Sequence, residues 1–588
     1  MHKKDISRKQ RLISYCVIYL TAIYPLHPAW GSVITSSDKT ITINQQNNIP
    51  IINIATPNDS GVSHNRFNVF NVNKQGAVLN NSQVDANSQL AKKISANKNL
   101  KGNTANLIIN EVVGNSRSQL LGKLEVAGQQ ADVLIANPNG ISCDGCSFIN
   151  TPSITLTTGK PQFSPQGTYS ALEVKKGSIV IGKQGMNADL QNYADIISRS
   201  IEINGKINAK NLSLMQGNNH IDFGKGTVNS INGEGVKPTV AIDTKALGGM
   251  YANQIRLVST EKGVGVNLTD IQTKQNSINL TVDGKITFNG NIQSEQDINV
   301  SSKALQMNSN ASLKAQRDIT LATNTLTNHS DIIAEKDMRL FVDKFTNKGE
   351  KALIQAKDNL WIQKNAQGEP SSLIENQSAT IKTEKGDLII RTKKLVNESI
   401  TPLFKEIKQE PDSTSSINIG THFLHPYNSP TNNFLIIILL AELKELSDKK
   451  WFDILDLKNN GGVNVERSLF EKNKKYVPSV IYSGKNLYIQ SNEFFNTQSD
   501  IFATNDLIAT GNNAKVYYYR FGHLNKWDLY SHDNAHIFYR DDVNKYNIDE
   551  TKFQKIVHFI PFTKTGSHYE FIVDSASEYM IKEIGRAS

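Results

Sequence analysis

The stretch Ser294-Glu-Gln-Asp297-Ile-Asn-Val300 recurs three times in altered form farther along the chain. The later copies are Ala315-Gln-Arg-Asp318-Ile-Thr-Leu321, Ala334-Glu-Lys-Asp337-Met-Arg-Leu340 and Ala356-Lys-Asp-Asn359-Leu-Trp-Ile362. The four starting positions lie 21, 19 and 22 residues apart. A unit of about 20 residues with two or three short strands cannot bury its apolar face alone, so successive units must stack. The spacing therefore predicts a right-handed parallel β-helix.

Short apolar alternation extends this prediction over residues 33–400. Examples are Ile154-Thr-Leu156, Ile201-Glu-Ile203 and Leu212-Ser-Leu214, separated by turns rich in Asn, Gly and Asp. Alternation with a period of two indicates strands, and no helical periodicity of comparable strength accompanies it. We therefore expect an all-β fold in which turn residues of the same kind form hydrogen-bonded ladders along the stack.

Asp297, Asp318 and Asp337 recur at the coil period, and this suggests a second class of protein. Polysaccharide lyases and hydrolases built on β-helices need carboxylates grouped on adjacent coils. Each of these Asp residues, however, precedes a strand at the same turn, where Asp ordinarily caps backbone N–H groups. We expect a structural ladder, no catalytic residue and no enzyme.

Length and charge exclude several other classes. For 588 residues the usual prior is about four globular domains, but the repeats replace that expectation with a stack. The net charge of +9 is spread along the chain, so nucleic-acid binding is not expected. Four lysine pairs are solvated charges in the first instance, and contact with an anionic glycan stays open as a hypothesis; they are Lys92-Lys93, Lys175-Lys176, Lys393-Lys394 and Lys474-Lys475.

The N-terminus has the order of a secretory signal peptide, residues 1–31. A basic start is followed by an apolar stretch from Leu12 to Leu26 and then by Ala29-Trp30-Gly31. The stretch is too short for a comfortable membrane span of about 20 residues, so an anchored N-terminus is the lesser alternative. Cys16 follows the bulky Tyr15 and is a poor lipid-attachment site. The second apolar run, 434–443, is also too short to span a membrane.

Cys143 and Cys146 are the two cysteines of the mature chain, in Cys143-Asp-Gly-Cys146. Two cysteines cannot fill a tetrahedral zinc site alone, and no further ligand pair accompanies them, so no metal and no cofactor are expected. An exported chain meets an oxidising environment, and Asp-Gly is a turn sequence. We predict a disulfide across a tight hairpin, with a redox role as the lesser alternative.

The repeat weakens after about residue 397. Four prolines and Ser413-Thr-Ser-Ser416 indicate a linker, and the stretch from Ala441 to Leu457 predicts a short amphipathic helix. Repeat-like pieces return at Gly484-Lys-Asn-Leu-Tyr-Ile489 and at 504–508. Residues 431–588 hold 25 of the 44 aromatic residues, so this part should pack differently. The segments 516–520 and 535–539 are expected to be strands of a β-rich cap.

Histidines crowd the last quarter of the chain, which is the composition of a nuclease or metal site. His532 and His536 are four residues apart, but their apolar neighbours favour a strand, where such residues lie about 13 Å apart. Surface or partly packed histidines explain the cluster, which comprises His523, His532, His536, His558 and His568.

Several motifs resemble one known family, the filamentous haemagglutinin-like exoproteins of two-partner secretion systems. They are Phe67-Asn-Val-Phe-Asn-Val-Asn73, Gly76-Ala-Val-Leu-Asn-Asn81, Ile109-Asn-Glu-Val-Val-Gly114, Ala136-Asn-Pro-Asn-Gly-Ile141, Thr155-Leu-Thr-Thr-Gly159, Leu247-Gly-Gly-Met-Tyr-Ala-Asn-Gln-Ile-Arg-Leu257 and Glu261-Lys-Gly-Val-Gly265. The resemblance covers residues 33–400 well and returns weakly near 484–511. It implies export through a dedicated outer-membrane transporter with periplasmic recognition domains.

The resemblance also implies a secretion motif. In that family the Asn-Pro-Asn-Gly segment, here Asn137, Pro138, Asn139 and Gly140, is needed for secretion, and Asn110 belongs to a second matching motif. A rigid Asn-Pro-Asn-Gly turn could present an ordered edge that a transporter strand would augment. The alternative is a structural turn without partner contact.

We therefore expect five segments. They are a signal peptide at 1–31, a two-partner secretion β-helix domain at 32–270, β-helix repeats at 271–400, a linker with a short helix at 401–480, and residual repeats with an aromatic-rich region at 481–588.

The resemblance predicts a secreted or surface-associated adhesin of a Gram-negative bacterium, exported via the periplasm, whose partner is a host-cell receptor or glycan. The alternative is a short or truncated carrier of a haemolysin or of a contact-dependent growth inhibition toxin. Long members of the family exceed this chain in length, and it has no Val-Glu-Asn-Asn-type junction before a toxin.

Overall fold

The computed structural model describes residues 34–401, 404–410, 437–439, 449–457, 463–472, 474–497, 499–511, 562–565 and 568–571. The predicted signal peptide lies outside these residues. The described residues form strands and turns with one 3-10 turn, η1 (Lys98–Leu100), and no α-helix. The chain divides into two compact units, Met1–Val264 and Gly265–Ser588.

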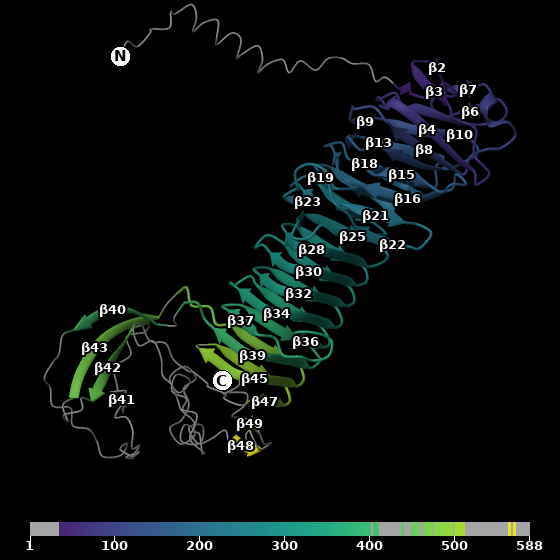
Figure 1. Ribbon diagram of the computed structural model, residues 1–588. Coiled ribbons are helices and arrows are strands. Elements are labelled where there is room, and N and C mark those ends of the chain that lie inside the picture. The colour runs from purple at the N-terminus through teal and green to yellow at the C-terminus, as the bar shows by residue number, and fades with distance from the viewer. Residues whose placement is uncertain are drawn as a thin grey trace, which may run out of the picture. The chain divides into compact units, whose positions relative to one another are not determined.

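In the first unit, parallel strands stack along three faces (Figure 1). The first face contains β4 (Val62–Val69), β8 (Leu107–Val112), β11 (Asp132–Ala136), β14 (Ser153–Thr157), β18 (Met186–Ser198), β20 (Lys206–Gln216) and β25 (Gln254–Ser259). The second contains β3 (Ile49–Asn53), β5 (Ala77–Asn81), β10 (Lys123–Gly128), β13 (Cys146–Ile149), the first parts of β18 and β20, and β24 (Gly249–Ala252). The third contains β9 (Ser118–Leu120), β12 (Ile141–Cys143), β17 (Ser178–Ile181), β19 (Ser200–Ile203) and β23 (Val240–Thr244).

Antiparallel strands begin the first unit. The strand β1 (Thr35–Ser36) pairs with β4, β2 (Thr42–Gln46) pairs with β3, and β6 (Ala86–Ser88) pairs with β7 (Lys92–Ile94). A stack of coils would otherwise end in an open edge, so these strands form an N-terminal cap.

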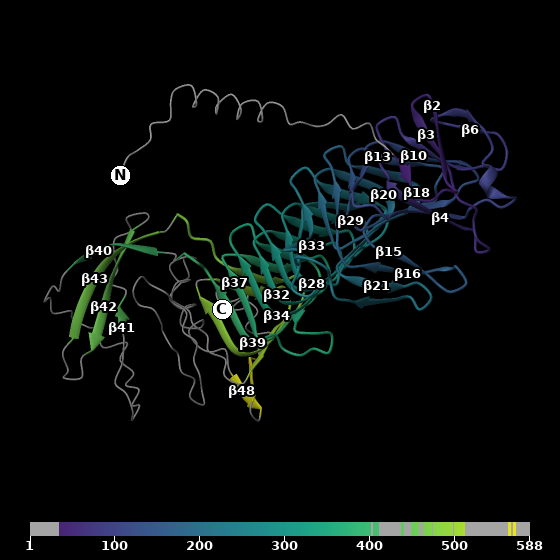
Figure 2. The same cartoon turned by 45° about the horizontal axis from the view of Figure 1, so that its top comes forward.

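A four-stranded antiparallel sheet lies beside the coils of the first unit (Figure 2). It consists of β15 (Lys160–Phe163), β16 (Tyr169–Val174), β21 (Asn219–Asp222) and β22 (Thr227–Ser230). Phe163 and Tyr169 of this side sheet pack against Ile109 and Leu134, which point outward from the coils. Apolar residues on this outer coil face are therefore buried as well.

The second unit has the same architecture. Its first face contains β28 (Ile278–Phe288), β30 (Ile298–Met307), β32 (Ile319–Asn328), β34 (Met338–Lys348), β36 (Leu360–Gln363), β39 (Leu388–Glu398), β45 (Leu487–Thr497) and β47 (Leu507–Gly511). Its second contains β26 (Gly265–Leu268), the later parts of the long strands β28 to β34, β37 (Leu373–Gln377), and the later parts of β39 and β45. Its third contains β27 (Asp270–Thr273), β29 (Asn291–Ser294), β31 (Ser312–Ala315), β33 (Asp331–Ala334), β35 (Leu353–Ala356), β38 (Thr380–Thr383), β44 (Val480–Ser483) and β46 (Asp500–Ala503). The prediction of an all-β parallel β-helix is confirmed.

The core of each coil follows directly from the alternation in sequence. Along β28 the side chains of Ile278, Leu280 and Val282 point inward and are at most 3% exposed. The residues between them face outward because successive strand residues point to opposite sides. Ile278 and Leu280 lie above Ile298 and Val300 of the next coil, and Ile298 in turn lies above Ile319. Hydrophobic burial along these columns stabilises the stack.

The expected linker with a short helix is wrong where the structure describes it. Residues 401–480 contain an antiparallel sheet of β40 (Phe404–Glu410), β41 (Ile437–Leu439), β42 (Lys449–Leu457) and β43 (Val463–Lys472). Residues 449–457 of the predicted helix form β42, and its residues 441–448 lie outside the described residues. A short apolar run fits the period of a helix or that of a strand. Because every residue of β42 pairs with β43, the segment is a strand.

The stack of the second unit resumes immediately after this insertion. The strand β44 pairs with β38, and β45 pairs with β39, although about 80 residues separate the two coils in sequence. The returning repeats near 484–511 therefore continue the coils of 265–400. At their end β47 pairs antiparallel with β49 (His568–Phe571), which pairs with β48 (Phe562–Thr565). The expected cap strands at 516–520 and 535–539 lie outside the described residues.

The described part of the chain contains no helix that is long and apolar enough to cross a membrane. Of the apolar run 434–443, the structure describes only 437–439, and these residues form β41.

Candidate functional site

The predicted secretion motif forms the turn between β11 and β12. The fully buried Asn137 side chain donates from Nδ2 to the Ser116 carbonyl and to Ser118 Oγ, each at 2.9 Å. Its Oδ1 accepts a 2.9 Å hydrogen bond from the Asn139 N–H. Asn139 Nδ2 in turn donates to the Gly114 carbonyl at 2.7 Å. The two asparagines therefore fasten the turn to segment 114–118.

Gly140 is held in a conformation that side chains rarely adopt, with φ of +106°. A Cβ at this position would lie 2.6 Å from the Ser178 carbonyl oxygen and 2.8 Å from Arg117 Nη1. The partly buried Arg117 side chain donates to the carbonyls of Ile141 and Ser178 at 2.9 and 2.8 Å. Pro138 is half-buried, and its carbonyl lies where a Cβ at Gly177 would clash. The turn is therefore enclosed by its neighbours on both sides.

The folded turn offers no free strand edge. Both edges of β11 are paired, with β8 and β14, and both edges of β12 are paired, with β9 and β17. Strand augmentation needs an unpaired edge, so a transporter could not add a strand to these two strands once the coils are formed. In the folded state the motif acts as a structural turn. Recognition of Asn137, Pro138, Asn139 and Gly140 by a transporter stays a prediction, and it would have to precede folding.

Asn110 lies on β8 with its side chain inside the coil, fully buried. It is aligned with Asn65 on one neighbouring strand and Ile135 on the other. Neither its Nδ2 nor its Oδ1 has a hydrogen-bond partner, whereas Asn65 bonds to the backbone of Ala55 and Ile109. An unsatisfied buried polar group costs about 1–3 kcal/mol. The Asn110 side chain therefore makes no hydrogen bond to the motif turn.

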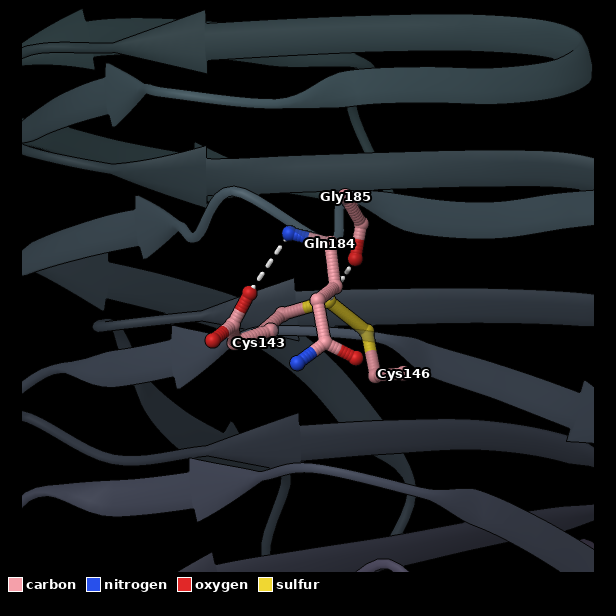
Figure 3. Close-up of a disulfide and its surroundings, with 5 residues drawn as sticks. Cys143, Cys146, Gln184 and Gly185 are labelled. Atoms are coloured by element: carbon pink, nitrogen blue, oxygen red, sulfur yellow. Dashed lines mark hydrogen bonds between the residues drawn. A yellow bond between two sulfur atoms is a disulfide. The ribbon is translucent and has the colours of Figure 1, made fainter.

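Cys143 and Cys146 form a disulfide, with Cα atoms 5.4 Å apart (Figure 3). The expected hairpin is wrong, because β12 and β13 do not pair with each other and belong to different faces of the stack. The disulfide spans the corner between these strands, and both cysteines are buried in the core. Asp144 accepts a 2.7 Å hydrogen bond from the Gln184 N–H, which links the corner to the next coil.

The repeated Asp residues form the expected structural ladder. Asp297 Oδ1 accepts from the Asp318 N–H at 3.2 Å, and Asp318 Oδ1 accepts from the Asp337 N–H at 3.3 Å. The series continues through Asn359 to Asp387 with bonds of 3.0 Å. Each of the three Asp carboxylates accepts a hydrogen bond from the next coil and forms an ion pair with Arg317 or Arg339. These contacts are those of structural residues that hold successive coils together.

The predicted histidine cluster cannot be assembled from the described residues. Of its members only His568 is described, on β49, and His532 and His536 lie outside. Among the residues that the structure places, no three His, Cys, Asp or Glu side chains gather as metal ligands.

Sequence reasoning missed a buried ion pair in the first unit. Arg199 donates from Nε and Nη2 to the two carboxylate oxygens of Glu261 at 3.2 and 3.0 Å, and from Nη1 to the Glu234 carbonyl at 2.6 Å. Both side chains are at most 10% exposed. Residues 62 positions apart can be paired only when the coils are in register. In the sequence, the only signal for this pair was that Glu261 begins the family-like motif Glu261-Lys-Gly-Val-Gly265.

A second missed feature is Asp195, on the outer face of β18. It is aligned with Thr155 and Ser213 on the neighbouring strands. Burial raises the pKa of Asp195 to about 6, and a hydrogen bond with Ser213 opposes this shift. The carboxyl group is therefore a pH-sensitive position within the secretion region.

One family model and several curated relatives match part of this chain. Residues 31–293 match the TPS secretion domain family. The chain is 46% identical over 315 residues to the "tRNA nuclease CdiA" of Yersinia mollaretii and 47% identical over 297 residues to the "16S rRNA endonuclease CdiA" of Enterobacter cloacae. These alignments cover 53% and 50% of this chain but only 10% and 9% of the relatives.

The solved structures include the "filamentous hemagglutinin secretion domain" at 32% identity, covering 51% of this chain and 95% of that one with a TM-score of 0.40. The secretion domain of HMW1 from Haemophilus influenzae matches at 15% identity, over 62% of this chain and 99% of that one, with a TM-score of 0.33. The expected resemblance is confirmed. The matching segment, residues 31–293, is similar to the TPS secretion domain.

Proposed function

We propose that the chain is an exoprotein that an outer-membrane two-partner transporter exports from a Gram-negative cell. The observation that carries this proposal is the family match over residues 31–293. The signal-like order of the first 31 residues supports entry into the periplasm. The exported chain would then be extracellular or attached to the cell surface.

The architecture suits passage of an unfolded chain. In a stack of coils each unit contacts only its neighbours, so folding can begin at one end and propagate. Asn137 is bonded to the preceding residues Ser116 and Ser118, and Asp132 N–H to the preceding Asn106 carbonyl. Coils that emerge first from a transporter can therefore form before later coils arrive.

After export we propose that the chain serves as the stalk of a contact-dependent growth inhibition exoprotein. Two relatives carry nuclease names, but the aligned part is about a tenth of their length. The bonding of Asp297, Asp318 and Asp337 as a scaffold supports a carrier without catalytic residues of its own. In this proposal any toxin activity belongs to a region other than the β-helix.

A haemagglutinin-like adhesin that contacts a host-cell receptor or glycan is the second candidate. The specific observation in its favour is a polar groove on the outward turns of the second unit, lined by residues that include His329, Lys348 and Lys351. An adhesin and a toxin carrier share the same export step, so the two candidates differ only in what the exported protein does.

The export proposal is tested by secretion of the full chain from cells with and without a two-partner transporter. We expect the protein in the medium only when the transporter is present. Asn137→Ala/Asn139→Ala removes the motif amides, one fully and one partly buried, and Asn347→Ala/Asn376→Ala removes two fully buried amides outside residues 31–293. Loss of secretion in the first variant alone supports recognition of the motif, whereas equal loss in both assigns it to folding.

The later role is tested with cells that display the exported chain. Growth inhibition of neighbouring cells that lack protection supports the toxin carrier. Attachment to host cells without growth inhibition supports the adhesin. Secretion that is independent of the transporter contradicts the whole proposal.

A further inference from the structure

Turn lengths vary in a regular way along one corner of the second unit. The turn between β28 and β29 has two residues, Asn289 and Gly290, and the turn between β32 and β33 also has two, His329 and Ser330. The turn between β30 and β31 has four residues, 308–311, and that between β34 and β35 also has four, 349–352. A short turn therefore lies between two long ones.

This alternation produces a groove of about 720 Å³ whose floor is the short turn at His329. The lining residues are polar or glycine, namely Asn289, Asn308, Ser309, Asn310, His329, Lys348, Gly349, Glu350 and Lys351. Its volume is within the range of small-ligand sites, which is about 300–1,000 Å³. No aliphatic side chain and no Phe, Tyr or Trp is among these lining residues, which argues against a lipid, an apolar peptide or a base stacked on such a ring.

One wall of the groove is held by a chain of amides. Gln306 Nε2 donates to Asn308 Oδ1 at 2.7 Å, and Asn308 Nδ2 donates to Asn289 Oδ1 at 2.6 Å. The floor is tied to the same wall, because Ser330 Oγ donates to the Ala311 carbonyl. A wall that is already ordered loses little conformational freedom when it binds a ligand.

The opposite wall orients the histidine. His329 Nδ1 lies 3.1 Å from the Lys348 carbonyl oxygen, which can only accept, so Nδ1 carries the proton. In the neutral ring Nε2 is then an acceptor for a hydroxyl group. The wall itself is fixed to the following coil by a 2.9 Å hydrogen bond from the Gly349 N–H to the Gln377 carbonyl.

The charges in the groove are unpaired within the described part of the chain. Neither Lys348 nor Lys351 has a carboxylate within 4.0 Å, and Glu350 has no basic partner at that distance, whereas Lys303 and Lys357 on the same unit pair with acids. Two ammonium groups and one carboxylate leave a single excess positive charge when the histidine is neutral. The two lysines can pair with an isolated negative charge, whereas Glu350 repels further negative charges close to it, so the site favours isolated charges over a dense row of them.

We propose that this groove binds a short acidic saccharide with about one carboxylate for every two sugar units. Sugar hydroxyls would bond to the free amide groups of the wall and to His329 Nε2, and the sugar carboxylate would meet Lys348 and Lys351. The inference concerns a different region from the secretion motif and does not depend on export.

The test is a binding titration of purified full-length chain at low ionic strength with three tetrasaccharides. Hyaluronan tetrasaccharide carries one carboxylate per disaccharide, cellotetraose is neutral, and heparin tetrasaccharide is densely sulfated. We expect saturable binding of the hyaluronan probe and weaker binding of the other two. Equal affinity for cellotetraose, or no saturable binding of the hyaluronan probe, overturns the proposal.

Charge variants locate the site. Lys348→Ala/Lys351→Ala should weaken binding by about tenfold or more, because it removes the charge-assisted bonds. Lys314→Ala/Lys336→Ala removes the same charge from exposed positions outside the groove and should leave affinity unchanged. Glu350→Gln removes a repelling carboxylate and should tighten binding by about two- to threefold. Equal loss in both lysine pairs would mean unspecific attraction of anions and contradicts the proposal.

A shape variant tests the groove without changing charge. Deletion of Ser309 and Asn310 shortens the wall turn to two residues, the length found at Asn289 and His329. The coil should still fold, because neighbouring coils use a turn of that length. We expect a loss of at least about fivefold in affinity with unchanged thermal unfolding. Unaltered binding in this variant would place the saccharide elsewhere.

Discussion

The side-chain amide of Asn347 donates a 2.9 Å hydrogen bond to Oδ1 of Asn376, one coil farther along the stack. Both side chains are fully buried. The same bond joins Asn328 to Asn347, Asn376 to Asn397, and Asn397 to Asn496, at 2.8, 2.8 and 2.7 Å. The row of stacked amides therefore continues across the insertion at 401–479 and holds the coils on both sides in one register.

The first prediction concerns this asparagine ladder. Asn376→Ala removes an amide that bonds to Asn347, Asn397 and the Ala379 carbonyl, and leaves buried partners unsatisfied. The free energy of unfolding should fall by about 2–3 kcal/mol, measured by denaturant titration. Asn299→Ala is the control, because its amide bonds to Asn279 on the exposed face, and the change should be within about 0.5 kcal/mol.

The second prediction concerns the unsatisfied amide of Asn110. Asn110→Leu replaces it with an apolar side chain next to Ile135 of the following coil, so the free energy of unfolding should rise by about 1–3 kcal/mol. Asn65→Leu on the adjacent strand removes an amide that is bonded, and should lower it. Destabilisation by both substitutions would show that Asn110 has partners that stabilise the fold.

The third prediction concerns the disulfide. Cys143→Ser/Cys146→Ser opens a loop of four residues, and the loss of this constraint on the unfolded chain should lower the free energy of unfolding by about 2 kcal/mol. Reduction of the wild-type protein should produce a similar decrease in the denaturant midpoint, and should not affect the variant. A midpoint that does not respond to reductant would contradict a stabilising role.

The sequence predicted the repeating part of the molecule because its determinants are local. The period that carries Asp297, Asp318 and Asp337 specified both the stacking and the ladder of turn carboxylates. The insertion was predicted less well, since the apolar run that forms β42 fits a helix or a strand until its partner strand is known.

The candidate sites were predicted only in part. The sequence placed Cys143 and Cys146 at a turn. It did not show that the strands on either side of this turn, β12 and β13, lie on different faces of the stack. The resemblance singled out Asn110 without indicating that its amide lacks partners. The groove at His329 depends on differences in turn length between coils, and such differences are visible only after the strands are placed in register.

The fourth prediction concerns the insertion between β39 and β44. Its two ends are held together, because Thr401 Oγ1 donates to the Lys475 carbonyl at 2.7 Å and Ser399 Oγ to the Val477 carbonyl at 2.8 Å. A short Gly-Ser linker in place of residues 402–474 should therefore leave the thermal unfolding midpoint within a few degrees of wild type. Deletion of one coil, 380–400, is the contrasting variant and should lower the midpoint strongly, since it removes the partners of β44 and β45.

The fifth prediction concerns pH and Asp195. The pKa of its carboxyl is raised by burial from 3.8 to about 6 in the folded chain, so folding disfavours the ionised form. This group's contribution to stability is fully present below about pH 4 and is lost as pH rises through 6, on the order of 3 kcal/mol by pH 7. Asp195→Asn should therefore unfold at higher denaturant than wild type at pH 7, and the difference should shrink toward pH 4.

The control for Asp195 is Asp189→Asn, an exposed residue of the same strand, which should keep the wild-type dependence of stability on pH. Ser213 offers an independent check, because its hydrogen bond opposes the effect of burial on the Asp195 carboxyl. Ser213→Ala should raise the Asp195 pKa further, and so steepen the loss of stability between pH 5 and 7. Identical pH profiles for wild type and Asp195→Asn would mean that the carboxyl is solvated in the folded protein.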